Sequence, residues 1–348
     1  MDSKMQQFRK PKKLTDKSHK QRRAGFELEF GNKSVRKTAE ALHRELGGNI
    51  EESNAFMITV KNSSMGTLTV VRDAQLLNSA RYRQVLANMN IEFNPGKLAS
   101  EIEQGVDSLS SVLIPCEIVT EPLLFEDFSK LNDVVRILNA LNAEGTQASI
   151  FYAFGLHINP SAPDLEPATL VSYLQAYLLL VDWIIETSGT DFTRRFFTSF
   201  IDPFPSAYFQ KILVPDYHPT VETFIDDYLE FNPTRNRGLD ILPILCEIDC
   251  DRVRAGLAKE EQSLVSGRPA FHYRLPDCRL GDENWSIADE WNRWWYVEAI
   301  AADNGLRKEL IDRWNENNNH FFLTGKRNGS MRSVVLNNLP DPKEAPHE

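Results

Sequence analysis

Two glutamates lie two residues apart in an apolar segment near the start of the chain, G-F-E-L-E-F. In a β-strand, Glu27 and Glu29 would share one face, about 6.5–7 Å apart. Phe26, Leu28 and Phe30 would then face the core. Two carboxylates on one buried face repel each other and resist the loss of water. A hard divalent cation such as Mg²⁺ would neutralise them, although a strand whose carboxylates face solvent has the same sequence pattern.

Three further strand-like segments carry polar residues between apolar ones. They are C-E-I-V-T with Glu117, F-G-L-H-I-N-P with His157 and Asn159, and F-H-Y-R with His272 and Arg274. Carboxylates and neutral imidazoles ligate Mg²⁺ or Mn²⁺. Arginine binds phosphate in a bidentate manner, with hydrogen bonds to two of its oxygens. The alternative for each histidine is a hydrogen-bonded core residue, and for Arg274 a surface ion pair.

Other phosphate-binding and nucleophile motifs are missing from the chain. Neither G-x-x-x-x-G-K-[ST] nor G-x-G-x-x-G occurs, and there is no G-x-S-x-G elbow. The chemistry of this sequence therefore depends on the strand-borne polar residues.

The elements expected to position these residues alternate irregularly. Strands are predicted at 24–30, 57–60, 66–71, 111–120, 149–158 and 270–275. Helices are predicted at 34–46, 74–110, 128–143, 167–187, 219–228 and, as one helix or two, 287–314. Irregular structure is expected at 192–217, and a loop at 232–238. Because βαβ units of regular length are missing, the pattern favours a single α+β domain over a doubly wound sheet.

The charge is distributed unevenly over the 348 residues. The chain carries −10 overall, with 42% hydrophobic and 25% charged residues, which is typical of a soluble globular protein and unlike a general nucleic-acid binder. Residues 1–23 hold nine Lys/Arg and two Asp, a charge of +7, so the rest carries −17. This segment is predicted to be a disordered, solubilising arm that could touch an anionic partner weakly.

The four cysteines and the most apolar stretch indicate a cytoplasmic protein. Cys116, Cys246, Cys250 and Cys278 form no C-x-x-C pair, which gives a zinc site little support and predicts reduced thiols. The apolar stretch 168–185 is interrupted by polar residues and is predicted to be a buried helix rather than a membrane span. The tryptophans of 285–295 are interpreted as the packed face of a helix.

The order GFELEF, CEIVTEPL, FGLHINP, RNRGLDIL and FHYRL resembles the amidoligase family of carboxylate–amine ligases, over roughly residues 24–300. That family is related to glutamine synthetase and glutamate–cysteine ligase. The resemblance implies a glutamine-synthetase-like domain, with a curved, mainly antiparallel sheet around a funnel-shaped site and helices outside. It also implies ATP, bound with Mg²⁺ or Mn²⁺, and amide formation through an acyl phosphate.

Carried over by motif, the resemblance implies a role for each matching residue. The implied metal ligands are Glu27, Glu29, Glu117, His157 and His272. Arg274, Arg268 and Asn159 would contact the nucleotide, and Arg274 with Arg235 or Arg237 would act in catalysis. Two positions depart from the family pattern: His272 stands where glutamate is usual, which favours softer metals, and Glu121 stands where proline is frequent, so its role stays open.

The resulting prediction is an ATP-dependent ligase that joins a small-molecule or peptide carboxylate to an amine. The alternatives are an inactive relative that acts as a binding or scaffold protein, and a guanidino phosphotransferase. The expected division is a basic arm at 1–23, a catalytic domain at 24–315 and an extension at 316–348.

Overall fold

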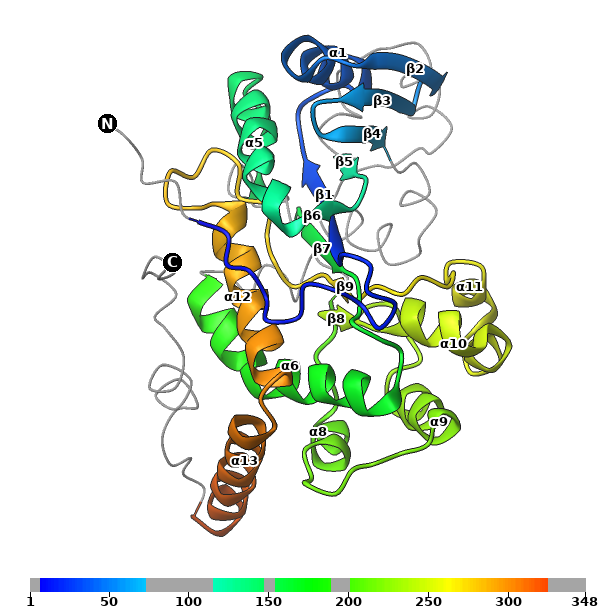
Figure 1. Cartoon of the computed structure of the whole chain (residues 1–348), viewed down its shortest axis with the longest axis vertical. Helices are drawn as coiled ribbons and strands as arrows, with labels where there is room; N and C mark the ends of the chain where they lie inside the picture. The colour runs from blue at the N-terminus through cyan, green and yellow to red at the C-terminus, as the bar shows by residue number, and fades with distance from the viewer. Residues whose placement is uncertain (1–6, 73–114, 147–153, 189–200, 325–348) are drawn as a thin grey trace, which may run out of the picture.

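The computed structural model describes residues 7–72, 115–146, 154–188 and 201–324. In this part of the chain, helices and a nine-stranded antiparallel sheet are combined, with the order β2-β3-β4-β5-β1-β7-β9-β8, while β6 pairs with β1. This combination of helices with an antiparallel sheet confirms the predicted α+β class (Figure 1). The sheet is open at both ends. The glutamine-synthetase-like fold and the funnel stay predictions.

The strands are β1 (Arg23–Phe30), β2 (Asn49–Asn54), β3 (Met57–Ser63), β4 (Gly66–Arg72), β5 (Cys116–Thr120), β6 (Leu123–Leu124), β7 (Leu156–Pro160), β8 (Leu239–Asp240) and β9 (His272–Tyr273). The prediction missed β2, whose sequence N-I-E-E-S-N is polar and exposed along its length. It also missed β8, which lies next to the predicted loop 232–238. The predicted helix 74–110 and the first part of the irregular segment 192–217 lie outside the described residues. The described part of that segment contains a helix at Ser206–Ile212, so the prediction of irregular structure was wrong there.

The helices are α1 (Val35–Leu46), α5 (Leu131–Ala140), α6 (Pro167–Ser188), α8 (Ser206–Ile212), α9 (Val221–Phe231), α10 (Leu242–Ala255), α11 (Lys259–Gln262), α12 (Ile287–Ala301) and α13 (Asn304–Thr324), with the 3₁₀ helix η2 (Phe125–Lys130) before α5. The predicted start of α1 is confirmed, since the Ser34 side chain caps its first turn. The helix α10 was missed. Its apolar residues cluster in the first turn instead of recurring at helical spacing, and Asp249 interrupts it with non-helical backbone angles.

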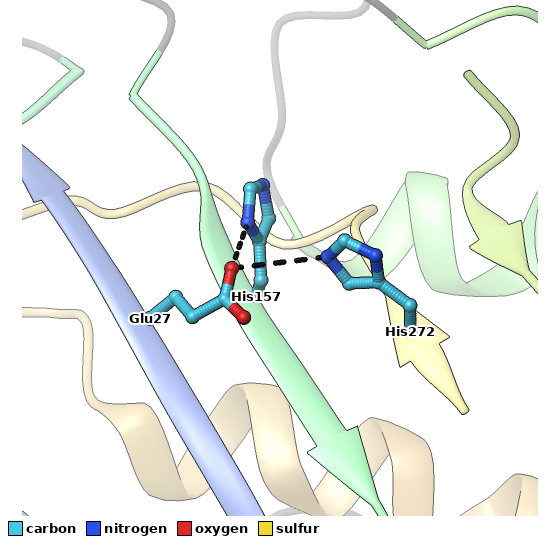
Figure 2. A group of neighbouring side chains, drawn as sticks. All are labelled: Glu27, His157 and His272. Carbon is cyan, nitrogen blue, oxygen red and sulfur yellow. Dashed lines mark hydrogen bonds and ion pairs between the residues drawn. The ribbon is translucent and has the colours of Figure 1, made fainter. Parts of the chain in front are cut away.

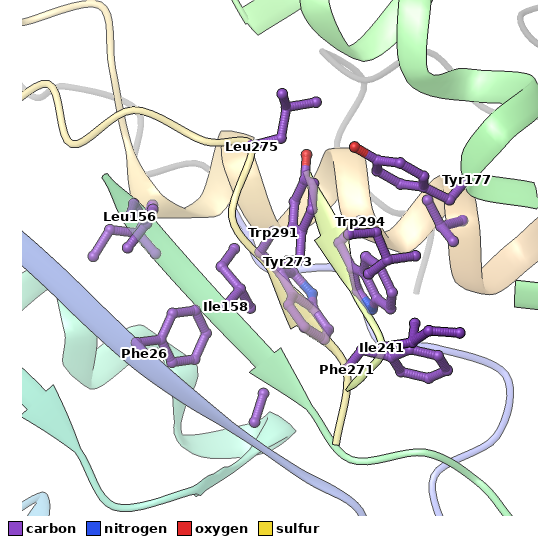
Figure 3. Close-up of a cluster of buried hydrophobic side chains, with 14 of the residues drawn as sticks. Phe26, Leu156, Ile158, Tyr177, Ile241, Phe271, Tyr273, Leu275, Trp291 and Trp294 are labelled. Atoms are coloured by element: carbon purple, nitrogen blue, oxygen red, sulfur yellow. The ribbon is translucent and has the colours of Figure 1, made fainter. Parts of the chain in front are cut away.

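The alternation of side chains along β1 separates a core from a site. Phe26 and Leu28 are fully buried, and the Phe26 ring lies 5.0 Å from that of Phe128 in η2 and 6.5 Å from that of Trp291 in α12. In β9, Tyr273 packs against Trp294, with the ring centroids 5.4 Å apart. Figure 3 shows Phe26, Tyr273, Trp291 and Trp294 packed together with the aliphatic side chains of Leu156 and Ile158 in β7. The opposite side of the strands, which we call the site face, carries Glu27, Glu29, Glu117, His157 and His272.

Residues 7–22 are part of the folded protein, so the prediction of a disordered arm over 1–23 was wrong for them. They run along α12 (Figure 1), where Arg9 is buried and its carbonyl accepts a 2.7 Å hydrogen bond from Trp291 Nε1. Arg22 is also buried, and its guanidinium makes hydrogen bonds of 2.7 and 3.0 Å to both carboxylate oxygens of Glu298 in α12. The prediction from composition failed for this segment because its backbone groups form hydrogen bonds with α12. A count of charged residues does not reveal such contacts.

Helix α6 is long and apolar enough to cross a membrane by length and composition alone. However, 67% of its most apolar window is buried inside the protein, where it packs against α12 and α13. The prediction of a buried helix is thereby confirmed. Cys246 and Cys250, one helical turn apart in α10, form a disulfide, so the prediction of four reduced thiols was wrong for this pair. Cys116 and Cys278 are buried and take part in no disulfide.

Candidate functional site

Five polar side chains converge on the site face from four different strands. Glu27 and Glu29 come from β1, Glu117 from β5, His157 from β7 and His272 from β9. Within this set, Glu27, His157 and His272 place one ligand atom each within 4.8 Å of one another, and so do Glu29, Glu117 and His157. We call the five residues the carboxylate–imidazole cluster. All five metal ligands predicted from the sequence therefore lie in one place.

Strand register explains why these residues meet. Glu27 is directly opposite His157 on β7, and Glu29 is directly opposite Glu117 on β5. Like charges directly opposite each other destabilise a sheet, so the Glu29–Glu117 pair indicates a place for a cation. His272 reaches the same face because its neighbour Tyr273, which pairs with Ile158, faces the core.

Glu27 contacts three other side chains of the site face. Its Oε2 lies 2.9 Å from His157 Nδ1 and 3.8 Å from His272 Nε2, and its Oε1 accepts a 2.8 Å hydrogen bond from Asn159 Nδ2 (Figure 2). Burial by itself would raise the pKa of Glu27. The hydrogen bond with His157, the charge interactions with the two imidazoles and the Asn159 amide nevertheless hold that pKa well below its usual value. Glu27 is therefore an anion at neutral pH, as a metal ligand must be.

His272 is buried, and neither of its ring nitrogens has a hydrogen-bond partner among the described residues. Burial lowers its pKa to about 4, so the ring is neutral near pH 7 and presents a lone pair. A buried polar side chain without a partner is costly. The residues present thus fit a metal ion, which would take up the lone pair of His272 between Glu27 and His157.

Two functional residues were missed by the sequence analysis. Asp240 in β8 is directly opposite His272 in β9, is fully buried, and places its Oδ2 3.8 Å from His272 Nδ1. Its signal was the pattern already used for the other strands, a carboxylate between apolar neighbours in G-L-D-I-L. Gly155 donates a 2.7 Å hydrogen bond from its N–H to Glu29 Oε2. A Cβ at Gly155 would come within 2.8 Å of His157 Nε2, so the missing side chain makes room for the imidazole.

Arg274 lies beside the cluster. Burial lowers the pKa of its guanidinium, and the nearby carboxylates of Asp240, Glu29 and Glu27 act in the opposite direction. Its Nη1 donates a 2.6 Å hydrogen bond to the Arg235 carbonyl, whereas its buried Nε has no partner among the described residues. Arg274 thus has a donor left for a ligand, and Arg235 is held next to it.

The other predicted arginines are placed differently. Arg237 uses Nε, Nη1 and Nη2 for hydrogen bonds to Asn232 Oδ1, the Pro203 carbonyl and the Phe231 carbonyl. These hydrogen bonds use all three nitrogens of its guanidinium to fix the surrounding loop. The structure therefore gives no support to a catalytic role for Arg237. Arg268 is exposed in the segment before β9.

Glu121 has a structural role. Its exposed carboxylate accepts a 2.8 Å hydrogen bond from the Thr67 N–H, and a Cβ at Gly66 would overlap that carboxylate. The glutamate therefore joins the start of β4 to the end of β5.

A family model described as "Putative amidoligase enzyme" matches residues 20–296 of the chain, most of its length. The match includes every member of the carboxylate–imidazole cluster, together with Asp240 and Arg274. The chain matches no curated protein and no solved structure.

Proposed function

Because the chain belongs to this amidoligase family, we propose that it joins a carboxylate to an amine at the expense of ATP, through an acyl phosphate. The substrates would be a small-molecule or peptide carboxylate and an amine or amino acid. The single observation that carries this proposal is the convergence of three carboxylates and two imidazoles on one face of the sheet. Such a set suits divalent ions, and phosphoryl transfer needs them to neutralise charge.

The proposed reaction has two steps because a carboxylate oxygen is a poor leaving group. A carboxylate oxygen of the substrate takes the γ-phosphoryl group of ATP, and the bond between that phosphorus and ADP breaks. The amine nitrogen then attacks the acyl carbon, inorganic phosphate leaves, and the nitrogen loses a proton. The protein's contribution is to hold the reactants in line and to balance the phosphate charge.

Glu29 and Glu117 are the residues proposed to hold Mg²⁺ together with ATP. Mg²⁺ in phosphoryl-transfer enzymes is bound through one or two carboxylates and the substrate phosphates, and these two carboxylates are paired across β1 and β5. When bound, the ion would withdraw charge from the phosphate oxygens. Glu29 would be oriented for this role by the Gly155 N–H.

Arg274 and Arg235 are the residues proposed to contact phosphate. Arg274 is half-buried beside the carboxylates, and its buried Nε has no hydrogen-bond partner among the described residues. Arg235 lies at the other end of the hydrogen bond made by Arg274. Asn159 spends its amide nitrogen on Glu27, and its buried Oδ1 has no partner among the described residues. An oxygen acceptor repels phosphate, so we assign Asn159 Oδ1 to a metal ion or to the N–H of the amine substrate.

The proposal also places the enzyme in the cytoplasm, where ATP is supplied. The long apolar helix α6 is consistent with a soluble protein, since most of it is buried. The Cys246–Cys250 disulfide argues the other way, because disulfides are rare in a reducing cytosol.

The proposal is tested by calorimetric titration of ATP into the full chain, with and without Mg²⁺. We expect Mg²⁺-dependent binding that Glu29→Ala weakens at least about tenfold, or 1.4 kcal/mol. The matched control is Glu121→Ala, which removes the same charge from a glutamate that contacts the Thr67 N–H and should leave ATP affinity unchanged. Arg235→Met should weaken binding more than Arg237→Met.

Activity is then measured as phosphate release that requires both a carboxylate and an amine. A phosphorylated guanidine among the products would identify a phosphotransferase instead. A wild-type chain that binds no ATP, with either metal and with candidate substrates present, would contradict the proposal and support a binding or scaffold role.

A further inference from the structure

The two triads in the carboxylate–imidazole cluster differ in ligand chemistry. Glu27, His157 and His272 offer two nitrogens and one carboxylate, while Glu29 and Glu117 offer two carboxylates. Imidazole favours first-row transition metals, and carboxylates favour Mg²⁺. One chain thus presents a softer and a harder position side by side.

His157 belongs to both triads, yet a neutral imidazole has only one acceptor nitrogen. The nitrogen that faces Glu27 is Nδ1, which donates a 2.9 Å hydrogen bond to Oε2 in the metal-free protein. A metal ion bound between these two atoms would take the place of that proton. Assigned to that side, His157 completes a position with Glu27 and His272. Glu29 and Glu117 are left as a pair of carboxylates, which is sufficient for Mg²⁺ bound with phosphate.

The separations in the first triad fit one ion. Ligands about 2.1 Å from a metal lie roughly 3–3.4 Å apart when neighbouring in a tetrahedral or octahedral shell. Glu27 Oε2 is 2.9 Å from His157 Nδ1 and 3.8 Å from His272 Nε2, so movements of a few tenths of an ångström would close the shell. Figure 2 shows both rings directed at the same carboxylate oxygen.

Asp240 supplies the partner that a metal-bound histidine needs on its far side. Metal-ligating imidazoles almost always donate their other N–H to a carboxylate, carbonyl or water. Asp240 Oδ2 faces His272 Nδ1 at 3.8 Å and has no hydrogen-bond partner among the described residues, while its Oδ1 is fixed by the Leu242 N–H at 2.9 Å. A fully buried carboxylate in this place is explained if it orients the ring of His272.

We infer that Glu27, His157 and His272, with Asp240 behind His272, form a position that selects a transition-metal ion such as Mn²⁺ over Mg²⁺, next to the Mg²⁺ position at Glu29 and Glu117. This inference rests on the proposed function, because it concerns the same cluster. In this inference, His272 is the ligand that determines metal specificity, and Asp240 is a positioning residue that orients His272.

The test is Mn²⁺ binding to the metal-stripped full chain without ATP, followed by electron paramagnetic resonance and competed with Mg²⁺. The Mn²⁺ signal should show couplings to two imidazole ¹⁴N nuclei in the wild type and to one in His272→Glu. The Mn²⁺/Mg²⁺ affinity ratio should fall at least tenfold in that variant. Asp240→Asn should keep both couplings and weaken Mn²⁺ binding by about 10- to 100-fold.

Glu29→Gln is the matched control, since it alters the other triad and should leave both nitrogen couplings in place. A single nitrogen coupling in the wild type, or an affinity ratio equal in wild type and His272→Glu, would overturn the inference. The wild-type spectrum decides even if a variant fails to fold. Because no nucleotide is present, selective Mn²⁺ binding without ligase activity would refute the proposed function alone, and ligase activity without selectivity would refute this inference alone.

Discussion

Gly155→Ala should weaken metal binding while leaving the fold intact. The added Cβ would lie 2.8 Å from His157 Nε2 and 3.4 Å from Glu29 Oε2. Ordinary contact begins at 3.4 Å, so the imidazole has to move by about 0.6 Å. Rotation of the His157 ring away from the added methyl group relieves the overlap, but it lengthens the 2.9 Å contact between His157 Nδ1 and Glu27.

The size of the expected effect follows from the tolerance of metal sites. Ligand distances in real sites vary by about 0.2 Å, a third of the movement that the methyl group imposes. We therefore expect Mn²⁺ affinity to fall at least tenfold, or about 1.4 kcal/mol. Stability should change little, because the atom displaced is the far end of a half-buried side chain.

Gly25→Ala provides the matched control on the neighbouring strand. Gly25 also lies on the site face, in β1, but its Cβ would meet nothing closer than 3.8 Å. The Mn²⁺ affinities of the two variants are compared by calorimetric titration, and circular dichroism verifies that both are folded. If Gly155→Ala binds Mn²⁺ as the wild type does, or if both variants lose binding equally, His157 is not positioned as a ligand by this glycine.

Two further predictions concern stability. Glu298→Gln should lower the free energy of unfolding by about 3–5 kcal/mol, because it leaves the buried Arg22 charge unpaired. Lys17→Ala, at an exposed pair, should cost less than about 1 kcal/mol in the same denaturant titration, and equal effects would contradict the structural role of the N-terminal segment. In metal-free protein, the pKa of His272 is about 4 when folded and 6.5 in the reference state. The unfolded chain therefore binds more protons between these values, and stability should fall by about 3 kcal/mol as pH drops from 6.5 to 4. His272→Gln should flatten this pH dependence, and an unchanged slope would refute the assignment.

Strand alternation is a local property, so the sequence alone could predict that Glu27 and Glu29 share a face, whereas Glu117, His157 and His272 were assigned as ligands through the resemblance to the family. Glu27 and Glu29 share a face for the same reason that Phe26 and Leu28 share the other, and no tertiary information is needed. What brings Glu117 opposite Glu29, or His272 opposite Asp240, is strand register, which depends on pairing between distant segments. Motif order could suggest Glu117 and His272 as members of the site, but it could not fix which residue each of them faces.

Other features depended on tertiary contacts and could not be predicted. Arg235 and Arg237 are equivalent in sequence, and only the structure shows that Arg237 is engaged by the loop while Arg235 adjoins Arg274. Residues 7–22 look disordered by composition. Their order comes from indole and amide groups of α12, such as Trp291 and Asn292, that lie more than 280 positions away in the sequence.

Helix α12 connects the N-terminal segment to the site. Its Trp291 contacts the ring of Phe26 in β1, and its Trp294 contacts the ring of Tyr273 in β9. Each of these aromatic residues is next to a cluster ligand in sequence, Glu27 or His272, and faces the opposite side of the sheet. The same helix holds Arg22 through Glu298, one residue before β1 begins. The backs of β1 and β9, two of the four strands that carry the carboxylate–imidazole cluster, are therefore held by one element. A change that shifts α12 should thus alter the separation of Glu27 and His272 without touching either side chain.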